Sequence, residues 1–118
     1  MNIALVDDDA SVRRGVSRLL RSQGFVCTTF ESGEDALAAP DLSRADCLIL
    51  DVNLTGIDGF ETRDRLEAIG LNLPVIFITA LLNINTYEWR SRLHGSPCLS
   101  KPFEESELIA AIRSILGN

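Results

Sequence analysis

The segment CLILD at residues 47–51 decides the fold, because an uninterrupted apolar run ends there on a carboxylate. Three other segments have the same form, namely IALVDD at 3–8, VIFIT at 75–79 and CLSK at 98–101. Short apolar runs of this kind, separated by helical patterns, are typical of buried parallel strands. The carboxyl ends of such strands lie along one edge of the sheet, where ligands bind. The sequence therefore predicts that three carboxylates, a hydroxyl and an ammonium gather along that edge.

The segments between these runs predict helices and one further strand. Val12, Val16, Leu19 and Leu20 recur at helical spacing, and Gly24 is expected to end that helix in a left-handed conformation. The expected strands cover residues 2–7, 25–29, 45–51 and 75–79, with a fifth that runs to Lys101. The five expected helices end at Gly24, Pro40, Gly70, Leu93 and Gly117, the fourth of them covering residues 84–93.

The alternation of five strands with five helices predicts an α/β fold with a doubly wound, five-stranded parallel sheet. The strand at 25–29 has no functional residue at its end, so we expect it at the edge of the sheet. This gives the strand order 2-1-3-4-5 of flavodoxin-like folds. With 118 residues the chain has the length of one domain, which we expect to cover residues 1–118 with no output domain.

The composition excludes several classes of protein. A formal net charge of −6 argues against direct binding of nucleic acid by this domain. The apolar runs are too short to cross a bilayer, and the amino terminus enters a strand at once. We therefore expect no membrane span, no signal peptide and a cytoplasmic location.

The three cysteines are expected to be reduced, buried thiols. Cys27, Cys47 and Cys98 are odd in number and lie in apolar strand segments. A disulfide or metal framework would need closer, paired spacings. His94 has no partner at ligand spacing and is expected in a loop.

Lys101 is the only lysine among eleven basic residues. A lone lysine is most often an incidental surface residue. This one, however, follows a predicted strand, as do the acidic residues and Thr79. A compact ammonium acts as a point charge toward phosphate, so the set predicts a site for a phosphoryl group.

The acidic residues predict a magnesium site at the same edge. Asp7, Asp8 and Asp51 would repel one another, and a hard cation relieves that repulsion. Mg²⁺ prefers oxygen ligands and is often shared between carboxylates and a phosphate. Asp9 is assigned instead to capping the helix that follows. Asp51 is the candidate nucleophile toward a phosphoryl group, with Lys101 and Thr79 as stabilising partners.

These residues resemble the receiver domain of two-component response regulators over the entire chain. The matching segments are VDD at 6–8, LD at 50–51 with Gly56 and Gly59 in the loop after it, ITA at 78–80 and KPF at 101–103. The KPF segment and the loop after Asp51 look most like receivers of the nitrogen-fixation regulator type. The joint match of all four segments is what makes the resemblance specific.

The resemblance implies a phosphorylation-controlled switch rather than an enzyme with turnover. It implies that Asp51 accepts a phosphoryl group from a histidine kinase, and that Lys101 contacts that group. It also implies that Mg²⁺ is bound by Asp8, Asp51 and the Asn53 carbonyl, with Asp7 acting mostly through water. The peptide bond before Pro102 is expected to be cis.

The resemblance fails at positions that relay the signal. Receivers usually pair the switch residue, here Thr79, with an aromatic residue three positions before the lysine, and that position is Cys98. The usual loop proline is Thr55, and His94-Gly95 replaces a common Gly-Ala. The fourth helix carries the bulky residues Tyr87, Trp89, Arg90 and Arg92. We expect altered read-out at the face formed by the fourth helix, fifth strand and fifth helix, where a homodimer or output domain would bind.

Two residues are expected to set the lifetime of the phosphorylated state. In the family these lie two positions beyond the phosphoacceptor and two beyond the threonine, which here are Asn53 and Leu81. An apolar Leu81 should hinder the attacking water, so we expect slow loss of phosphate.

Two alternatives remain open. A haloacid-dehalogenase-type phosphatase has a similar nucleophile motif, which DVNLT at 51–55 resembles, but Asn53 replaces its general acid. The acidic pair that such a phosphatase needs after the lysine is instead at the amino terminus, and Glu104, Glu105 and Glu107 are expected at a helix start. The other alternative is a docking module that keeps the fold without phosphorylation. The chain suits either a stand-alone regulator or a fragment of a longer one.

Overall fold

The computed structural model describes residues 1–80 and 87–117. Leu81 and residues 84–86 of the expected fourth helix lie outside the described residues. In chain order the elements are β1 (Asn2–Val6), α1 (Ala10–Ser22), β2 (Val26–Phe30), α2 (Gly33–Ala38), the 3₁₀ helix η1 (Pro40–Arg44), β3 (Cys47–Asp51), α3 (Gly59–Ala68), β4 (Val75–Thr79), α4 (Tyr87–Leu93), β5 (Cys98–Ser100) and α5 (Glu105–Ile115).

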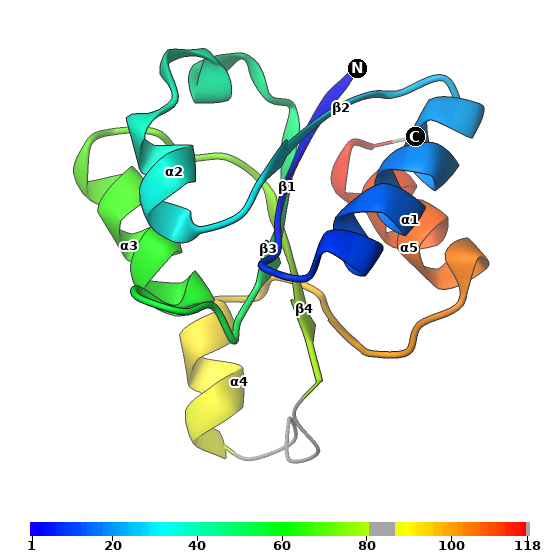
Figure 1. Cartoon of the computed structure of the whole chain (residues 1–118). Helices are drawn as coiled ribbons and strands as arrows, with labels where there is room; N and C mark the ends of the chain where they lie inside the picture. The colour runs from blue at the N-terminus through cyan, green and yellow to red at the C-terminus, as the bar shows by residue number, and fades with distance from the viewer. Residues whose placement is uncertain (81–86, 118) are drawn as a thin grey trace.

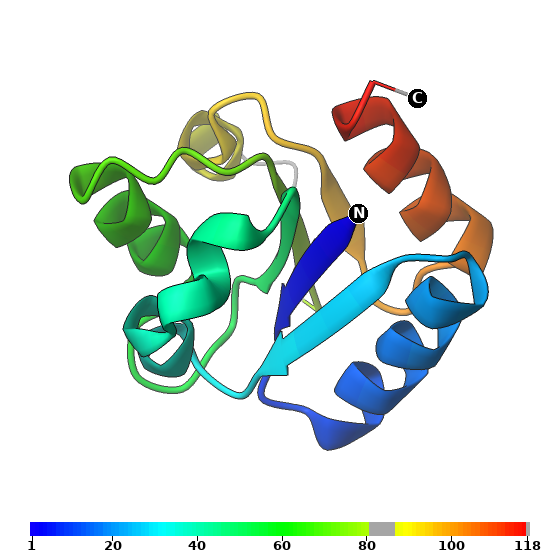
Figure 2. The same cartoon turned by 90° about the horizontal axis from the view of Figure 1, so that it is seen from above.

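The strands form one parallel sheet in the order β2-β1-β3-β4-β5, which confirms the predicted topology. Figure 1 shows α1 and α5 on one face of the sheet and α2, α3 and α4 on the other. The view from above in Figure 2 shows the same three layers, with β1 between β2 and β3.

Each face of the sheet carries its own apolar core, because successive strand residues point to opposite faces. Ala4, Val6, Leu48, Leu50 and Phe77 pack under α2, α3 and α4, together with buried side chains from those helices such as Phe60. The alternate strand residues, among them Ile3, Leu5 and Ile49, pack under α1 and α5. Burial on both faces explains the uninterrupted apolar runs of β1, β3 and β4.

Local signals in the sequence fix the ends of the helices. Asp9 caps α1, since its side chain accepts a hydrogen bond from the Ser11 N–H, which confirms its assignment. Gly24 follows this helix with a φ of 87°. Glu104 and Glu107 form a reciprocal capping box at the start of α5.

The structure corrects two expectations. The second helix stops at Ala38, and Pro40 opens η1 instead of ending a helix. Proline favours a first helical position because it has no N–H to pair there. Cys98 is only partly buried, whereas Cys27 and Cys47 are buried, and all three are free thiols. Burial raises the pKa of the Cys47 thiol to about 12, so this thiol stays protonated.

No helix in the described ranges combines the length and the apolar character that a membrane crossing requires.

The backbone approaches Gly59 too closely for any side chain. A Cβ atom there would lie 2.8 Å from the Val52 Cα and would collide with the Asp51 carbonyl oxygen. The Gly59 N–H also donates to the Val52 carbonyl oxygen at 3.0 Å. The close approach therefore fixes the turn that follows Asp51.

We expect Gly59→Ala to lower the free energy of unfolding by about 1–3 kcal/mol, because the turn would have to open. Gly15→Ala is the matched control, since a Cβ atom on Gly15 in α1 would meet no atom within 4 Å. That control is expected to stabilise the protein by roughly 0.5–1 kcal/mol through helix propensity. Urea denaturation of the three proteins measures both effects. Equal stabilities for the two variants would contradict the steric argument.

Candidate functional site

The sheet brings the predicted residues to one edge. Asp7 follows β1, Asp51 ends β3, Thr79 ends β4 and Lys101 follows β5. Asp7 and Thr79 are fully buried, and Asp51 is 3% exposed. The order β1-β3-β4-β5 places these strand ends next to one another, as the sequence predicted.

The Lys101 ammonium joins two of the carboxylates. Its Nζ donates to Asp7 Oδ2 at 2.8 Å and to Asp51 Oδ2 at 3.1 Å. The remaining oxygens accept backbone hydrogen bonds, Asp7 Oδ1 from the Asp9 N–H at 2.9 Å and Asp51 Oδ1 from the Asn53 N–H at 3.0 Å. Every oxygen of these two buried carboxylates thus has a partner, which makes their burial tolerable. The Lys101–Pro102 peptide bond is cis, the expected geometry.

Burial and charge act against each other on these groups. Burial raises the pKa of Asp51, and the nearby charge of Asp7 adds to that effect, while the Asn53 N–H and Lys101 oppose it. Burial alone would lower the pKa of Lys101, but the hydrogen bonds to Asp7 and Asp51 outweigh it and raise the pKa. The ammonium is therefore held protonated, and the ionised Asp51 is held in a less favourable environment than water.

Three carboxylates form a possible metal centre. Asp7, Asp8 and Asp51 each offer an oxygen, and these oxygens lie within 4.8 Å of one another. Asp8 is exposed, so its carboxylate can reach an ion that keeps part of its water shell. An all-oxygen donor set next to a buried carboxylate of raised pKa fits a hard divalent cation such as Mg²⁺.

Two further residues contact the site without having been predicted to do so from the sequence. Thr55 Oγ1 donates to Asp8 Oδ2 at 3.3 Å. Arg13 Nη1 donates to the Asp7 carbonyl oxygen at 2.8 Å and pairs with Glu31 at 3.5 Å. The replacement of a proline by Thr55 was a visible signal, but Arg13 looked like an ordinary helical arginine.

Cys98 packs against the apolar cluster on the face of the sheet that α3 and α4 cover. It is paired with Phe77 in the β4–β5 register, while Thr79 is paired with Ser100 two positions further along. Residues two apart on a strand share a face, so Cys98 and Thr79 face the same side. Burial raises the pKa of the Cys98 thiol, which leaves a small neutral group where the family usually has a ring.

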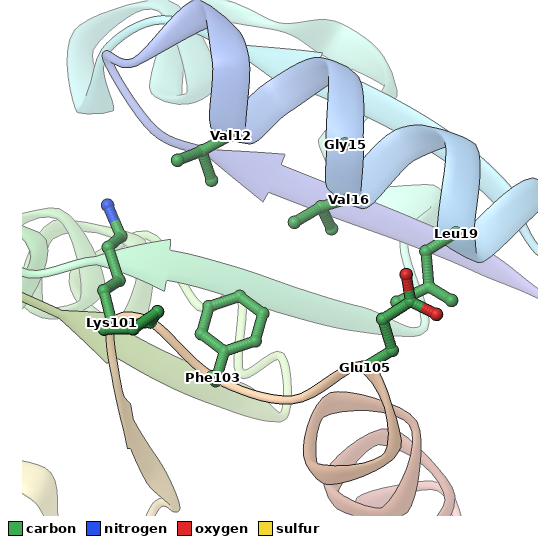
Figure 3. Close-up of a pocket in the computed structure, with 8 residues that line it drawn as sticks. Val12, Gly15, Val16, Leu19, Lys101, Phe103 and Glu105 are labelled. Carbon is green, nitrogen blue, oxygen red and sulfur yellow. The ribbon is translucent and has the colours of Figure 1, made fainter.

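A groove of about 450 Å³ opens beside the Lys101 side chain. Figure 3 shows it between α1 and the segment that leads from β5 to α5, with Phe103 directed toward Val16 and Lys101 at one end. Its walls are mainly apolar and consist of Val12, Gly15, Val16, Leu19, Lys101, Pro102, Phe103 and Glu105. The groove places an apolar surface next to the Lys101 side chain of the carboxylate site.

Comparison with known proteins places this geometry in a family. Residues 3–113 match the family model of the response regulator receiver domain. Nodulation protein W of Bradyrhizobium diazoefficiens is 33% identical over 93% of this chain and 48% of its own length. The transcriptional regulatory protein FixJ of Azorhizobium caulinodans is 32% identical over 98% of this chain and 54% of its own length. The chain thus spans about half the length of these relatives.

Solved structures show the same fold. The chemotaxis protein CheY4 of Vibrio cholerae has a TM-score of 0.86 and 27% identity, with 98% of both chains covered. The response regulator TrrA of Thermotoga maritima, solved in complex with Mg²⁺-BeF, has a TM-score of 0.83 and 25% identity, again with 98% of both chains covered. The FixJ match agrees with the expected nitrogen-fixation regulator type. On the family match, the shared fold and the carboxylate edge together, the chain belongs to the receiver domains of two-component response regulators.

Proposed function

We propose that this domain is a phosphorylation-controlled switch in which Asp51 accepts a phosphoryl group from a histidine kinase. The observation that carries the proposal is the Lys101 ammonium, which is held 3.1 Å from the buried Asp51 carboxylate beside two further acidic residues. A phosphoryl group that arrives at Asp51 would thus meet a fixed positive charge. Positioning and charge neutralisation supply most of the catalysis in phosphoryl transfer.

In the proposed reaction one carboxylate oxygen of Asp51 attacks the phosphorus atom of a phosphohistidine. The new O–P bond gives an acyl phosphate, and the N–P bond breaks with its electron pair going to the imidazole. Lys101 would turn its hydrogen bond from the carboxylate to the phosphoryl oxygens, and the buried Thr79 hydroxyl would follow from the neighbouring strand end. Each domain accepts one phosphoryl group on Asp51, so it acts stoichiometrically, and hydrolysis of the acyl phosphate later returns the carboxylate and inorganic phosphate.

The residues that would hold Mg²⁺ are Asp8, Asp51 and the Asn53 carbonyl, with Asp7 acting through water. When bound, the ion neutralises charge on the carboxylates and on the phosphoryl oxygens. TrrA, a response regulator with the same fold, was solved in complex with Mg²⁺-BeF, which supports a magnesium-dependent reaction in the present domain.

Two surfaces are proposed for partners. The apolar groove beside Lys101 suits the phosphodonor protein, because it is a concave apolar surface that borders the edge where Asp51 lies. The face formed by α4, β5 and α5 is proposed for a homodimer or an output domain. FixJ is named a transcriptional regulatory protein, and this chain spans 54% of its length, so a separate output segment fits the proposal.

A docking module that works without phosphorylation is the second candidate. Cys98 favours it, because a small neutral thiol gives little steric signal on the face that Thr79 shares. This candidate needs neither magnesium nor an acyl phosphate, so chemistry at Asp51 separates the two.

We expect intact mass to rise by one phosphoryl group after incubation with acetyl phosphate and Mg²⁺. The gain should be absent without Mg²⁺ and absent in Asp51→Asn, since the amide cannot form the acyl phosphate. Asp9→Asn is the matched control, because Asn keeps the cap of α1 and should be phosphorylated normally. Unchanged mass for the wild-type protein would make the docking module the better description.

Mg²⁺ is expected to raise the thermal midpoint of the wild-type protein at constant ionic strength. At ten times the dissociation constant the gain in stability is about 1.4 kcal/mol. Asp8→Asn should reduce the gain, because it removes the most accessible ligand, whereas Asp9→Asn should keep it. Equal gains in both variants, measured by differential scanning fluorimetry, would contradict the assigned ligands.

Asp51→Asn is expected to stabilise the unphosphorylated protein near neutral pH by roughly 0.5–2 kcal/mol. Because the pKa of Asp51 is raised in the folded state, stability falls as pH rises from the unfolded-state pKa through the folded-state pKa. The gain in unfolding free energy of Asp51→Asn over the wild-type protein should therefore be largest above the folded-state pKa of Asp51. It should disappear below the unfolded-state pKa. Urea denaturation across acidic and neutral pH measures the difference, and a gain that does not depend on pH would contradict this origin.

A further inference from the structure

Helix α4 is attached to α3 by a cluster of two arginines and two aromatic rings, which we call the α3–α4 clamp (Phe60, Arg63, Trp89 and Arg92). The Phe60 ring is central, with its centroid 5.2 Å from that of Trp89 in an edge-to-face arrangement. The Arg92 guanidinium lies 4.3 Å from the Phe60 centroid, and that of Arg63 lies 5.5 Å from it. Such contacts strengthen as water is excluded.

Arg63 is the unusual member of the clamp, because it is 5% exposed. A buried arginine must find acceptors for its guanidinium. Its Nη1 donates to the Arg92 carbonyl oxygen, while Nε and Nη2 donate to Asp64 Oδ1 at 3.1 and 2.9 Å. The last carbonyl oxygens of a helix have no partner within it, so Arg63 of α3 satisfies an end of α4.

The clamp is continuous with the loop that follows Asp51. Arg92 Nη2 lies 3.9 Å from Asp58 Oδ2, and the other oxygen of Asp58 caps α3 by accepting from the Glu61 N–H at 2.8 Å. The next residue, Gly59, packs against the Asp51 carbonyl oxygen with no room for a side chain. A shift of the Asp51 loop would thus move the amino end of α3 and, with it, the Arg92–Asp58 contact.

Phe60 connects the α3–α4 clamp to the sheet. Its ring centroid lies 5.0 Å from that of Phe77 on β4, and the Arg63 guanidinium lies 5.4 Å from the Phe77 centroid. Phe77 is the register partner of Cys98, the position where receivers usually carry a ring. The aromatic contacts next to β5 therefore come from α3, β4 and α4.

We propose that Arg63 is a positioning residue that fixes the carboxyl end of α4 on α3, so that α4 responds to Asp51 through α3 instead of through a ring on β5. The response to Asp51 rests on the proposed phosphorylation. The fixing of α4 does not, and the two parts are tested separately.

Hydrogen exchange of the unphosphorylated protein tests the first part. In Arg63→Met, which keeps an apolar stem, the amides of residues 91–96 should exchange about tenfold or more faster, because a charge-assisted hydrogen bond is lost. Arg65→Met is the matched control, since Arg65 is exposed on the same helix and pairs only loosely with Glu61 at 3.7 Å. Amides of α1 should be unchanged in both variants. Unaltered exchange of residues 91–96 in Arg63→Met would overturn the proposal.

Trp89 reports the second part, because it is the only tryptophan in the chain. Its emission should change when Asp51 is phosphorylated in the wild-type protein and in Arg65→Met. In Arg63→Met the change should fall by at least half at equal gain in mass, and Arg63→Lys should restore part of it. An equal change in Arg63→Met would overturn transmission through the clamp. If no variant gains mass, both the phosphorylation and its transmission are overturned, and hydrogen exchange alone decides whether Arg63 fixes α4.

Discussion

The ion pair network of Lys101 with Asp7 and Asp51 is the interaction on which the arrangement of this site depends. Lys101 lies 94 positions from Asp7 and 50 positions from Asp51 in the sequence, so the network holds the ends of β1, β3 and β5 together. Two buried carboxylates without a cation would be very unfavourable, and the backbone N–H groups of Asp9 and Asn53 compensate only one oxygen each. The ammonium therefore makes the carboxylate edge possible before any phosphoryl group or metal binds.

The same network leaves the two faces of the sheet with different properties. Toward α1 and α5, Lys101 borders an apolar groove that no side chain of the described residues fills. Toward α3 and α4, the buried Arg63 guanidinium is enclosed by the Phe60 and Phe77 rings and donates to the Arg92 carbonyl oxygen near the end of α4. One face thus carries an open apolar groove next to the Lys101 side chain, and the other is closed by the packing of α3 and α4.

The edge of the sheet could be predicted from the sequence because its determinants are local. An apolar run that ends on Asp51 or just before Lys101 predicts both the strand and the residue at its end. The parallel topology then brings these strand ends together. Arg63 could not be predicted in this way. Its burial results from α4 packing over α3, and its acceptor on Arg92 lies 29 residues away. Likewise, the contact of Thr55 with Asp8 spans 47 residues, so neither partner's immediate sequence indicates it. The missed helix η1 is a different case, because Pro40 is compatible both with ending one helix and with beginning another.

The physical nature of the α3–α4 clamp suits a receiver in which Cys98 replaces a ring. A ring on β5 would signal by volume, since it must occupy one of two spaces. Arg63 and Arg92 instead act through charge and direction, because a guanidinium hydrogen bond and a cation–π contact both weaken when donor and acceptor shift slightly out of alignment. Cys98 and Trp89 pack against the same buried cluster, which includes Phe60 and Phe77. Because the Cys98 thiol is small, side chains of α3 order that cluster. Helix α3 begins at Gly59, which lies against the Asp51 backbone. With Cys98 in place of a ring on β5, Asp51 is therefore still connected to α4, and the connection runs through α3.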